Sequence, residues 1–446
     1  MAKAQAPDER PATDLEAGGE APTADAARIA SMLEQIAVTG TVPRRPGITR
    51  LAYSEPERAA HRLFAGWLEE IGLAVHTDAA GNTIAQLPGT DLDAPAIAIG
   101  SHLDSVPEGG RFDGIVGVVG AVEAARVLAG RDARTTHPLR FVAFAAEEGA
   151  RFGEPCIGSK IVARRLRTAT LARRDRDGVS LAEAMAGVGV DSRRLSEAAW
   201  DPADWAAFLE LHIEQARVLE SGGRRIGLVD SVSGSTRVRI TVLGQADHSG
   251  GTPMHMRVDA LAAAAEIIVA AERLANEPQN RGARITVGQI QVAPNSITTI
   301  SGQADVTVDI RDLDWDRQRA IAERVVQLAS EVGERRGAGV EVDLLAHTTP
   351  VVLPMWIRTV AAETCSDLGI PYRVLPSGAG HDAQVINAIV PAGIVFVPSR
   401  GGLSHVPDEW TNPTDVALGV DVLCGMVDRL DAVLTSGAKG TTDESA

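Results

Sequence analysis

Histidines and carboxylates recur along the chain in short motifs whose residue types suit metal-assisted hydrolysis. In GSHLDSVPEGGRFDG, His102 and Asp104 lie two residues apart, and Asp113 follows in a glycine-rich turn. Residues two apart on an extended backbone share a side, so Asp104 could orient a metal-ligating imidazole of His102. By themselves, these residues would equally suit a polar loop with a capping aspartate.

A second motif, AFAAEEGARF, places Glu147 and Glu148 directly after a mostly apolar segment. Neighbouring side chains on an extended backbone point to opposite sides, so one carboxylate could bind a metal while the other faces a water molecule. A solvated pair in a loop is the alternative. The apolar segment argues against it, because it predicts a buried strand that delivers both carboxylates to a sheet edge.

Three further motifs contribute histidines, and each also has a structural explanation. His212 in LELHIEQ could be a hydrogen-bonded core histidine, and His405 lies in the glycine-rich segment PSRGGLSHVPDEW. His381 and Asp382 in SGAGHDAQ could cap a helix, although such a turn also offers N–H groups to an anion. Together, the motifs favour a site of nitrogen and oxygen ligands, which suits Zn²⁺, Mn²⁺, Co²⁺ or Ni²⁺.

Composition and missing motifs exclude several other functions. The 446 residues carry a net charge of −16 and only 3% aromatic residues, which opposes binding to nucleic acids or anionic membranes. The sequence has no GxSxG, Walker or GxGxxG motif, and no apolar run of the roughly 20 residues that a membrane span needs. Its three cysteines are widely spaced without a CxxC pair, so we expect no disulfide framework and a cytoplasmic location.

The elements that position these motifs alternate between strands and helices, which predicts an α/β fold. Expected helices cover 26–36, 55–72, 114–128, 356–368 and 413–434, and expected strands include 96–102, 139–148 and 392–398, with a hairpin at 74–87. His102, Glu147 and Glu148 fall at the ends of expected strands, where the sites of such sheets lie.

Residues 233–348 follow a different pattern, with strands near 236–244, 283–292, 303–312 and 340–347 and helices over 253–276 and 314–336. This β-α-β-β-α-β order is that of the ferredoxin-like unit. We therefore predict a disordered arm over 1–24, a discontinuous catalytic domain over 25–232 and 349–435, an inserted domain over 233–348, and a loose tail over 436–446.

Taken in order, six segments resemble the M20-type metallo-amidases of the hydantoinase/carbamoylase family: GSHLDSVPEGGRFDG, EEGARF, ELHIEQ, GQADHSGGTPMHMRVDA, GHDA and SHVPDEW. This family includes N-carbamoyl-L-amino-acid hydrolases, β-ureidopropionases and allantoate amidohydrolases. The resemblance runs from about Ala26 to about Leu434. It implies a metallopeptidase-like catalytic domain, an inserted ferredoxin-like domain that acts as lid and dimer contact, and a homodimer.

By position, the resemblance implies a centre of two divalent metal ions. His102 and His212 would hold one ion, Glu148 and His405 the other, and Asp113 would bridge them. Peptidase relatives have a carboxylate where His212 stands, so HIEQ favours the ureido branch.

The resemblance also implies roles around the ions. Glu147 would be the general base, Asp104 would orient His102, and His248 would reach the reacting carbonyl, in this family often across a dimer interface. Gln215 and Arg311 would contact the substrate, with Arg311 binding a carboxylate.

Two further substrate contacts are expected at His381 and Thr298. The family usually has an asparagine thirteen residues before the arginine, where this chain has Thr298. This departure affects the expected binding of the substrate carboxylate and leaves the metal ligands unchanged.

The resulting hypothesis is hydrolysis of N-carbamoyl-L-amino acids to an amino acid, ammonia and carbon dioxide. Allantoate amidohydrolase and β-ureidopropionase are the nearest alternatives, because they share the metal ligands. An aminoacylase or dipeptidase is disfavoured by His212. A non-catalytic ligand-binding relative or an assembly subunit is disfavoured because every expected position is filled.

Overall fold

The computed structural model describes residues 23–131 and 133–437. The predicted arm over 1–24 and tail over 436–446 lie almost entirely outside these residues. Ala24, which the sequence places in the arm, is held in the fold: its backbone N–H donates to Asp421 Oδ1 at 2.9 Å. No helix in the described ranges is long and apolar enough to cross a membrane.

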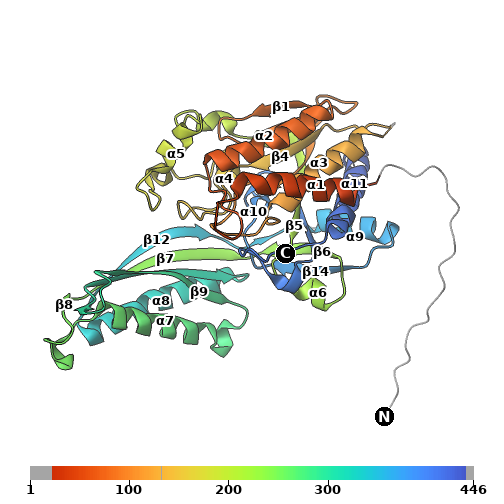
Figure 1. Ribbon diagram of the computed structural model, residues 1–446. Helices are drawn as coiled ribbons and strands as arrows, with labels where there is room; N and C mark the ends of the chain where they lie inside the picture. Colours follow the sequence, from red (N-terminus) through yellow and green to blue (C-terminus); the bar gives the residue numbers. More distant parts are fainter. Residues whose placement is uncertain (1–22, 132, 438–446) are drawn as a thin grey trace, which may run out of the picture.

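A nine-stranded mixed sheet forms the larger part of the molecule (Figure 1). Its spatial order is β1 (Ala74–Thr77), β2 (Thr83–Leu87), β4 (Leu139–Phe144), β3 (Ala96–His102), β5 (Trp205–Ile213), β15 (Ala392–Val397), β6 (Ile226–Val232) and β13 (Val351–Val352), with β14 (Tyr372–Ser377) also paired to β6. The central strands β4, β3, β5 and β15 are parallel to one another. Their carboxyl ends therefore meet at one edge, as the sequence predicts for an α/β sheet.

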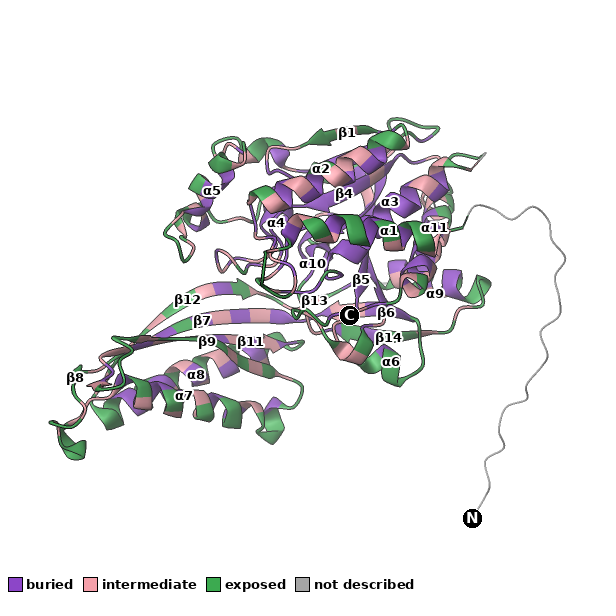
Figure 2. Cartoon of the chain, in the orientation of Figure 1, coloured by how far each residue is buried: buried purple, intermediate pink, exposed green. Residues whose placement is uncertain are grey.

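Helices cover both faces of this sheet, because side chains alternate between two apolar cores. Ile97 and Ile99 of β3 belong to one core, and Ala98 belongs to the other. The first core also takes residues from α1 (Ala26–Ala37), α2 (Glu55–Glu70), α3 (Ile115–Ala129), α9 (Met355–Asp367) and α11 (Pro413–Thr435). The second takes residues from α4 (Ile157–Val162), α5 (Leu181–Gly187), α6 (Val218–Ser221) and α10 (Asp382–Ile386). Figure 2 shows the buried strands between these layers.

Helix α3 packs unusually closely on the sheet, and two glycines allow it. A Cβ on Gly117 would lie 2.3 Å from the carbonyl oxygen of Leu211 in β5. Gly114, at the helix start, has a φ of 70°, and a Cβ there would lie 2.4 Å from the His102 ring. Glycine at both positions therefore lets α3 begin directly beside the carboxyl ends of β3 and β5.

A second, four-stranded antiparallel sheet extends away from the first (Figure 1). Its spatial order is β12 (Gly339–Thr348), β7 (Gly234–Leu243), β11 (Gln303–Asp312) and β9 (Arg284–Ala293), and its helices are α7 (Ala260–Ala275) and α8 (Trp315–Arg336). Along the chain these elements follow the predicted β-α-β-β-α-β order. A small pair, β8 (Asp247–His248) and β10 (Thr299–Ile300), lies at the far end of this sheet.

The first helix of this unit is shorter than the predicted 253–276. It begins at Ala260, because the Asp259 side chain caps it by accepting the Ala262 N–H at 3.1 Å. Residues Met254–Met256 form a separate 3-10 turn. Other 3-10 turns cover Val38–Gly40, Thr168–Ala172, Leu195–Ala198, Pro202–Asp204, Pro278–Asn280 and Arg400–Gly402.

The chain enters and leaves the second sheet at neighbouring points. Val232 at the end of β6 pairs with Val351 of β13, so the two connections run side by side. The buried Gln384 side chain of α10 donates to both of them, to the carbonyl oxygens of Ser233 at 3.1 Å and Thr349 at 2.9 Å. One amide group therefore ties both connections to the large sheet.

Candidate metal centre

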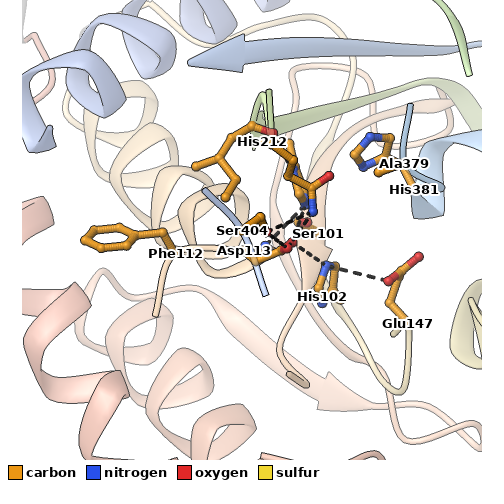
Figure 3. Close-up of polar contacts among 12 residues, drawn as sticks. Ser101, His102, Phe112, Asp113, Glu147, His212, Ala379, His381 and Ser404 are labelled. Atoms are coloured by element: carbon orange, nitrogen blue, oxygen red, sulfur yellow. Dashed lines mark hydrogen bonds and ion pairs between the residues drawn. The ribbon is translucent and has the colours of Figure 1, made fainter. Parts of the chain in front are cut away.

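The predicted site residues of the large sheet converge at the carboxyl ends of its parallel strands (Figure 3). His102 is the last residue of β3, and Glu147 and Glu148 follow β4. His212 is the residue before the last one of β5. His405 comes from the loop after β15. Polar residues at or after the carboxyl ends of β3, β4, β5 and β15 thus lie close together.

Two histidines and a carboxylate form the first cluster. Asp113 Oδ1 lies 3.2 Å from His212 Nε2 and 3.7 Å from His102 Nε2. All three side chains are buried. His212 Nδ1 lies 2.9 Å from the carbonyl oxygen of Ile213, which leaves Nε2 directed at the cluster.

The second cluster shares Asp113 with the first. His405 Nε2 lies 3.3 Å from Asp113 Oδ2 and 3.2 Å from Glu148 Oε2. The charge of Glu148, aided by Asp113, raises the pKa of His405 to about 11. These carboxylates therefore create a strongly negative position, which favours a cation.

The donor atoms fit a pair of divalent cations. In each cluster the three potential ligand atoms lie within 4.8 Å of one another, and all are imidazole nitrogens or carboxylate oxygens. Asp113 contributes one oxygen to each cluster, as a bridging carboxylate would. This donor set suits Zn²⁺ and the other divalent ions expected from the sequence.

Glu147 belongs to neither cluster and lies beside the first. Its Oε2 is 3.8 Å from His102 Nε2, and its Oε1 accepts a hydrogen bond from the buried Cys156 thiol at 3.0 Å. Burial, with the nearby charge of Glu148, raises the pKa of Glu147 to about 7. A carboxylate with such a pKa is suited to exchange protons near neutral pH.

Asp104 does more than the sequence indicates. Its Oδ1 lies 3.5 Å from His102 Nδ1, consistent with orienting that ring. The same carboxylate accepts the backbone N–H groups of Glu147 at 2.7 Å and Glu148 at 3.1 Å. Asp104 therefore fixes the two glutamates relative to His102.

Sequence reasoning missed Glu409, a buried carboxylate in the loop that carries His405. Its Oε1 accepts the N–H groups of Phe112 at 2.8 Å and Asp113 at 3.0 Å. Its Oε2 accepts the Ser404 hydroxyl at 2.9 Å, and that hydroxyl also contacts Asp113 Oδ2 at 2.6 Å. Burial, with the charge of Asp113, raises the pKa of Glu409 to about 7.

Two more buried carboxylates were missed, each of which accepts a hydrogen bond from one backbone N–H group distant in sequence. Glu57 of α2 accepts the N–H groups of Tyr53 at 2.7 Å and Ala146 at 2.8 Å, and Ala146 directly precedes Glu147 and Glu148. Glu210 of β5 accepts the Ala383 N–H at 2.9 Å and the Ser101 hydroxyl at 2.8 Å. The sequence offers one signal for both: a carboxylate within an otherwise apolar helix face or strand.

Gln215 and His381 also lie at the clusters. The Gln215 amide donates to Asp113 Oδ2 and, at 3.3 Å, to Ser404 Oγ. His381 packs against His212 with ring centroids 4.5 Å apart, and its Nε2 lies 2.8 Å from Ser377 Oγ. Burial, with the neighbouring His212, lowers the pKa of His381 well below its usual value, so this ring is neutral. It starts a five-residue helix without making a side-chain cap, which removes the capping explanation.

The second sheet carries the remaining predicted residues, and the structure separates them. Arg311, at the near end of β11, donates to the Gly378 carbonyl oxygen of the large domain at 3.2 Å. His248 and Thr298 lie together at the far end, where His248 pairs with Thr299 and both predicted residues are exposed. Within one chain, Figure 1 shows β8 at the end of the second sheet that is remote from β5.

The family model for peptidase family M20/M25/M40 matches residues 98–429. The chain belongs to this family. The sequence is 41% identical over 387 residues to an N-carbamoyl-L-amino acid amidohydrolase of Geobacillus stearothermophilus, covering 86% of this chain and 94% of that protein. It is 33% identical to the allantoate amidohydrolase of Bacillus subtilis, covering 86% of this chain and 93% of that one.

A solved hydantoinase/carbamoylase family amidase from Burkholderia vietnamiensis has the same fold, with a TM-score of 0.86 at 32% identity. The match covers 92% of this chain and 98% of that structure. These relatives confirm the predicted family, and they identify this M20 chain as an amidohydrolase of C–N bonds other than peptide bonds.

Proposed function

We propose that this M20 amidohydrolase hydrolyses the ureido C–N bond of N-carbamoyl-L-amino acids. The observation that carries the proposal is Asp113, shared by two clusters of metal-type ligands, with the unshared carboxylate of Glu147 alongside. A ureido carbonyl is a poor electrophile because two nitrogens donate into it. Two divalent ions, when bound, polarise such a carbonyl and lower the pKa of water.

The side chains of the large domain divide the remaining work. His102 and His212 would hold one ion, Glu148 and His405 the other, and Asp113 both. Glu147 accepts the proton of the attacking water and returns it to the leaving nitrogen, as a carboxylate with a pKa near 7 can. Asp104 accepts the backbone N–H groups of both glutamates and so fixes the base Glu147 relative to the ligand Glu148.

The second sheet supplies a cationic anchor and an oxyanion donor. The planar guanidinium of Arg311 would bind the substrate carboxylate. The His248 Nδ1 accepts the N–H groups of Gly250 and Gly251, both at 3.0 Å, so its proton is on Nε2, ready to donate to a developing oxyanion.

Because His248 is remote from the clusters of its own chain, we infer that it serves the site of a second copy. The functional form would then be a homodimer, with the second sheet as both dimer contact and lid. Thr298, the neighbour of the His248 strand, would approach that same partner site.

The proposed preference for carbamoyl-amino acids is supported by relatives that are named for this reaction. Allantoate hydrolysis is the second candidate, because Thr298 replaces the expected asparagine in the substrate grip and a relative named for that reaction covers the same length.

A substrate panel with controlled metal content tests the proposal. Chain loaded with Mn²⁺, Zn²⁺, Co²⁺ or Ni²⁺ should release ammonia from N-carbamoyl-L-methionine faster than from allantoate or N-carbamoyl-β-alanine. Chelation should abolish this release, and the restoring ion should bind at two per chain by elemental analysis. Full activity in a metal-free preparation, or release from allantoate alone, would contradict the proposal.

A further inference from the structure

A large cleft of about 1240 Å³ lies between loops of the large domain and strands of the second sheet, beside the segment that follows Glu147 and Glu148. Its wall includes Gly149 and Ala150, which directly follow Glu147 and Glu148, and strand residues of the second sheet. Six arginines and four aspartates line it, so the cleft is positively charged although the whole chain is strongly acidic. The arginines are Arg151, Arg173, Arg174, Arg176, Arg237 and Arg239.

The second sheet turns one polar face towards this cleft. Along β7, Val238 and Ile240 are buried in the core under α7 and α8, whereas Arg237 and Arg239 point to the opposite side. This alternation is that of a strand buried on one face. Arg237, near the start of β7, is therefore presented to the cleft beside the segment that follows Glu147 and Glu148.

Arg237 is coupled to the expected carboxylate anchor Arg311 through one acid. Asp309 of β11 is the cross-strand partner of Arg237. Its Oδ2 accepts the Arg311 Nε–H at 2.9 Å, while its Oδ1 lies 3.6 Å from Arg237 Nε. Two guanidinium groups thus share a single carboxylate, which leaves one positive charge uncompensated.

The donors of Arg237 are free to take a ligand. In the described part of the chain Asp309 is its only ion-pair partner, at a separation too long for a hydrogen bond. A Cβ added to Gly149 would lie 3.0 Å from Arg237 Nη1, so the guanidinium rests against the backbone that follows the two glutamates. A group attached to the reacting substrate would be within its reach.

We propose that Arg237 is a specificity-determining residue that binds a second carboxylate of the substrate. The preferred substrates are then N-carbamoyl derivatives of dicarboxylic amino acids, with the α-carboxylate on Arg311 and the side-chain carboxylate on Arg237. This inference rests on the proposed carbamoyl hydrolysis and narrows its substrate class. An arginine is suited to this task because its planar fork matches a carboxylate bidentately.

The test compares N-carbamoyl-L-glutamate with its uncharged analogue N-carbamoyl-L-glutamine, which has nearly the same shape. The wild-type chain should prefer the glutamate compound in kcat/KM. Arg237→Gln should lower kcat/KM for that compound by about 10- to 100-fold, the usual worth of a hydrogen bond to a charged group. The same variant should change kcat/KM for the glutamine compound less than about threefold, because no charged contact is lost there.

Two further variants guard against a folding artefact. Arg237→Lys keeps the charge and should retain part of the preference, and Arg239→Gln removes a neighbouring charge on the same face of β7 and should retain all of it. Equal losses on both substrates in Arg237→Gln, or the same selective loss in Arg239→Gln, would overturn the assignment to Arg237.

N-carbamoyl-L-methionine separates failure of this inference from failure of the proposed function. If the wild-type chain hydrolyses it at least as well as the glutamate compound, the dicarboxylate inference is wrong and the proposed function stands. If the metal-loaded chain hydrolyses no carbamoyl-amino acid, both are wrong.

Discussion

Glu409 Oε1 accepts the backbone N–H of Asp113 at 3.0 Å, across nearly 300 residues of sequence. The other Glu409 oxygen holds the Ser404 hydroxyl, beside His405. One buried carboxylate thus connects the turn that carries Asp113 to the loop that carries His405. Such outer partners orient metal ligands and affect their affinity.

Glu409→Ala should therefore weaken metal binding without removing a ligand. We expect the affinity of the cluster formed by Asp113, Glu148 and His405 to fall by roughly 10- to 100-fold. Metal titration followed by calorimetry measures this directly. Asp408→Ala, at the exposed neighbouring position, is the matched control, and an equal effect there would show that the loop, rather than Glu409, is responsible.

Adjacent Glu147 and Glu148 should respond differently to the same substitution. Glu147→Gln keeps the shape but removes the proton acceptor, so kcat should fall about 10²- to 10⁴-fold with both ions retained. Glu148→Gln should instead lose one ion and regain activity at high metal concentration. Measuring metal content and kcat for both variants distinguishes the general base from the metal ligand. Loss of an ion in Glu147→Gln, with both ions retained in Glu148→Gln, would show that Glu147 is the ligand and Glu148 the base.

Complementation between inactive variants should reveal whether His248 acts on a second chain. His248→Ala and Glu147→Gln should each be nearly inactive alone. When they are mixed, unfolded and refolded together, a heterodimer has one site with both an intact Glu147 and a partner's intact imidazole. About a quarter of wild-type activity should return, since half of the dimers are mixed and each has one working site. Without any recovery, and with mixed dimers present, His248 would act in its own chain or not at all.

Arg311 should affect substrate binding more than chemistry. Arg311→Ala should mainly raise KM for carboxylate-bearing substrates, and Arg311→Lys should restore only part of the loss because lysine lacks the planar fork. Steady-state kinetics on a carbamoyl-amino acid and on its amide measure the effect. Arg319→Ala, on the exposed surface of α8, is the control. Unchanged KM in both Arg311 variants would place the substrate carboxylate elsewhere.

Local patterns were sufficient to predict many of the elements, but they gave no prediction for the helices and strands from α4 to β6. Apolar periodicity and strand-end polarity located α2, α3, β3 and β15 within a few residues, and the change of rhythm near residue 233 anticipated the second sheet. Two expected elements are too long. The helix expected over 253–276 begins only at Ala260, because Asp259 caps it later than the apolar pattern suggests. The strand expected over 139–148 ends at Phe144, because Ala146 has a φ of 60° and turns the chain out of the extended conformation before Glu147 and Glu148. What the sequence does not contain is the spatial order of nine strands, which depends on contacts between distant segments.

Some residues of the candidate site could be predicted from local motifs, and others could not. His102, Asp113, Glu148, His212 and His405 stand in motifs, and the structure brings them into two clusters. Glu409, Glu57 and Glu210 were missed because each accepts a hydrogen bond from at least one backbone N–H group far away in sequence, and no spacing rule connects a carboxylate to such a partner. The separation of His248 from the clusters likewise requires the position of one sheet relative to the other.

The neighbouring connections at Ser233 and Thr349 have an evolutionary consequence. Since Val232 and Val351 already pair, excising everything between these connections would leave a β-hairpin at the border of the large sheet. No strand of the large sheet depends on the excised part for a hydrogen-bonding neighbour. Exchange of this segment by recombination would therefore change the second sheet of a descendant protein and leave both clusters of candidate metal ligands intact.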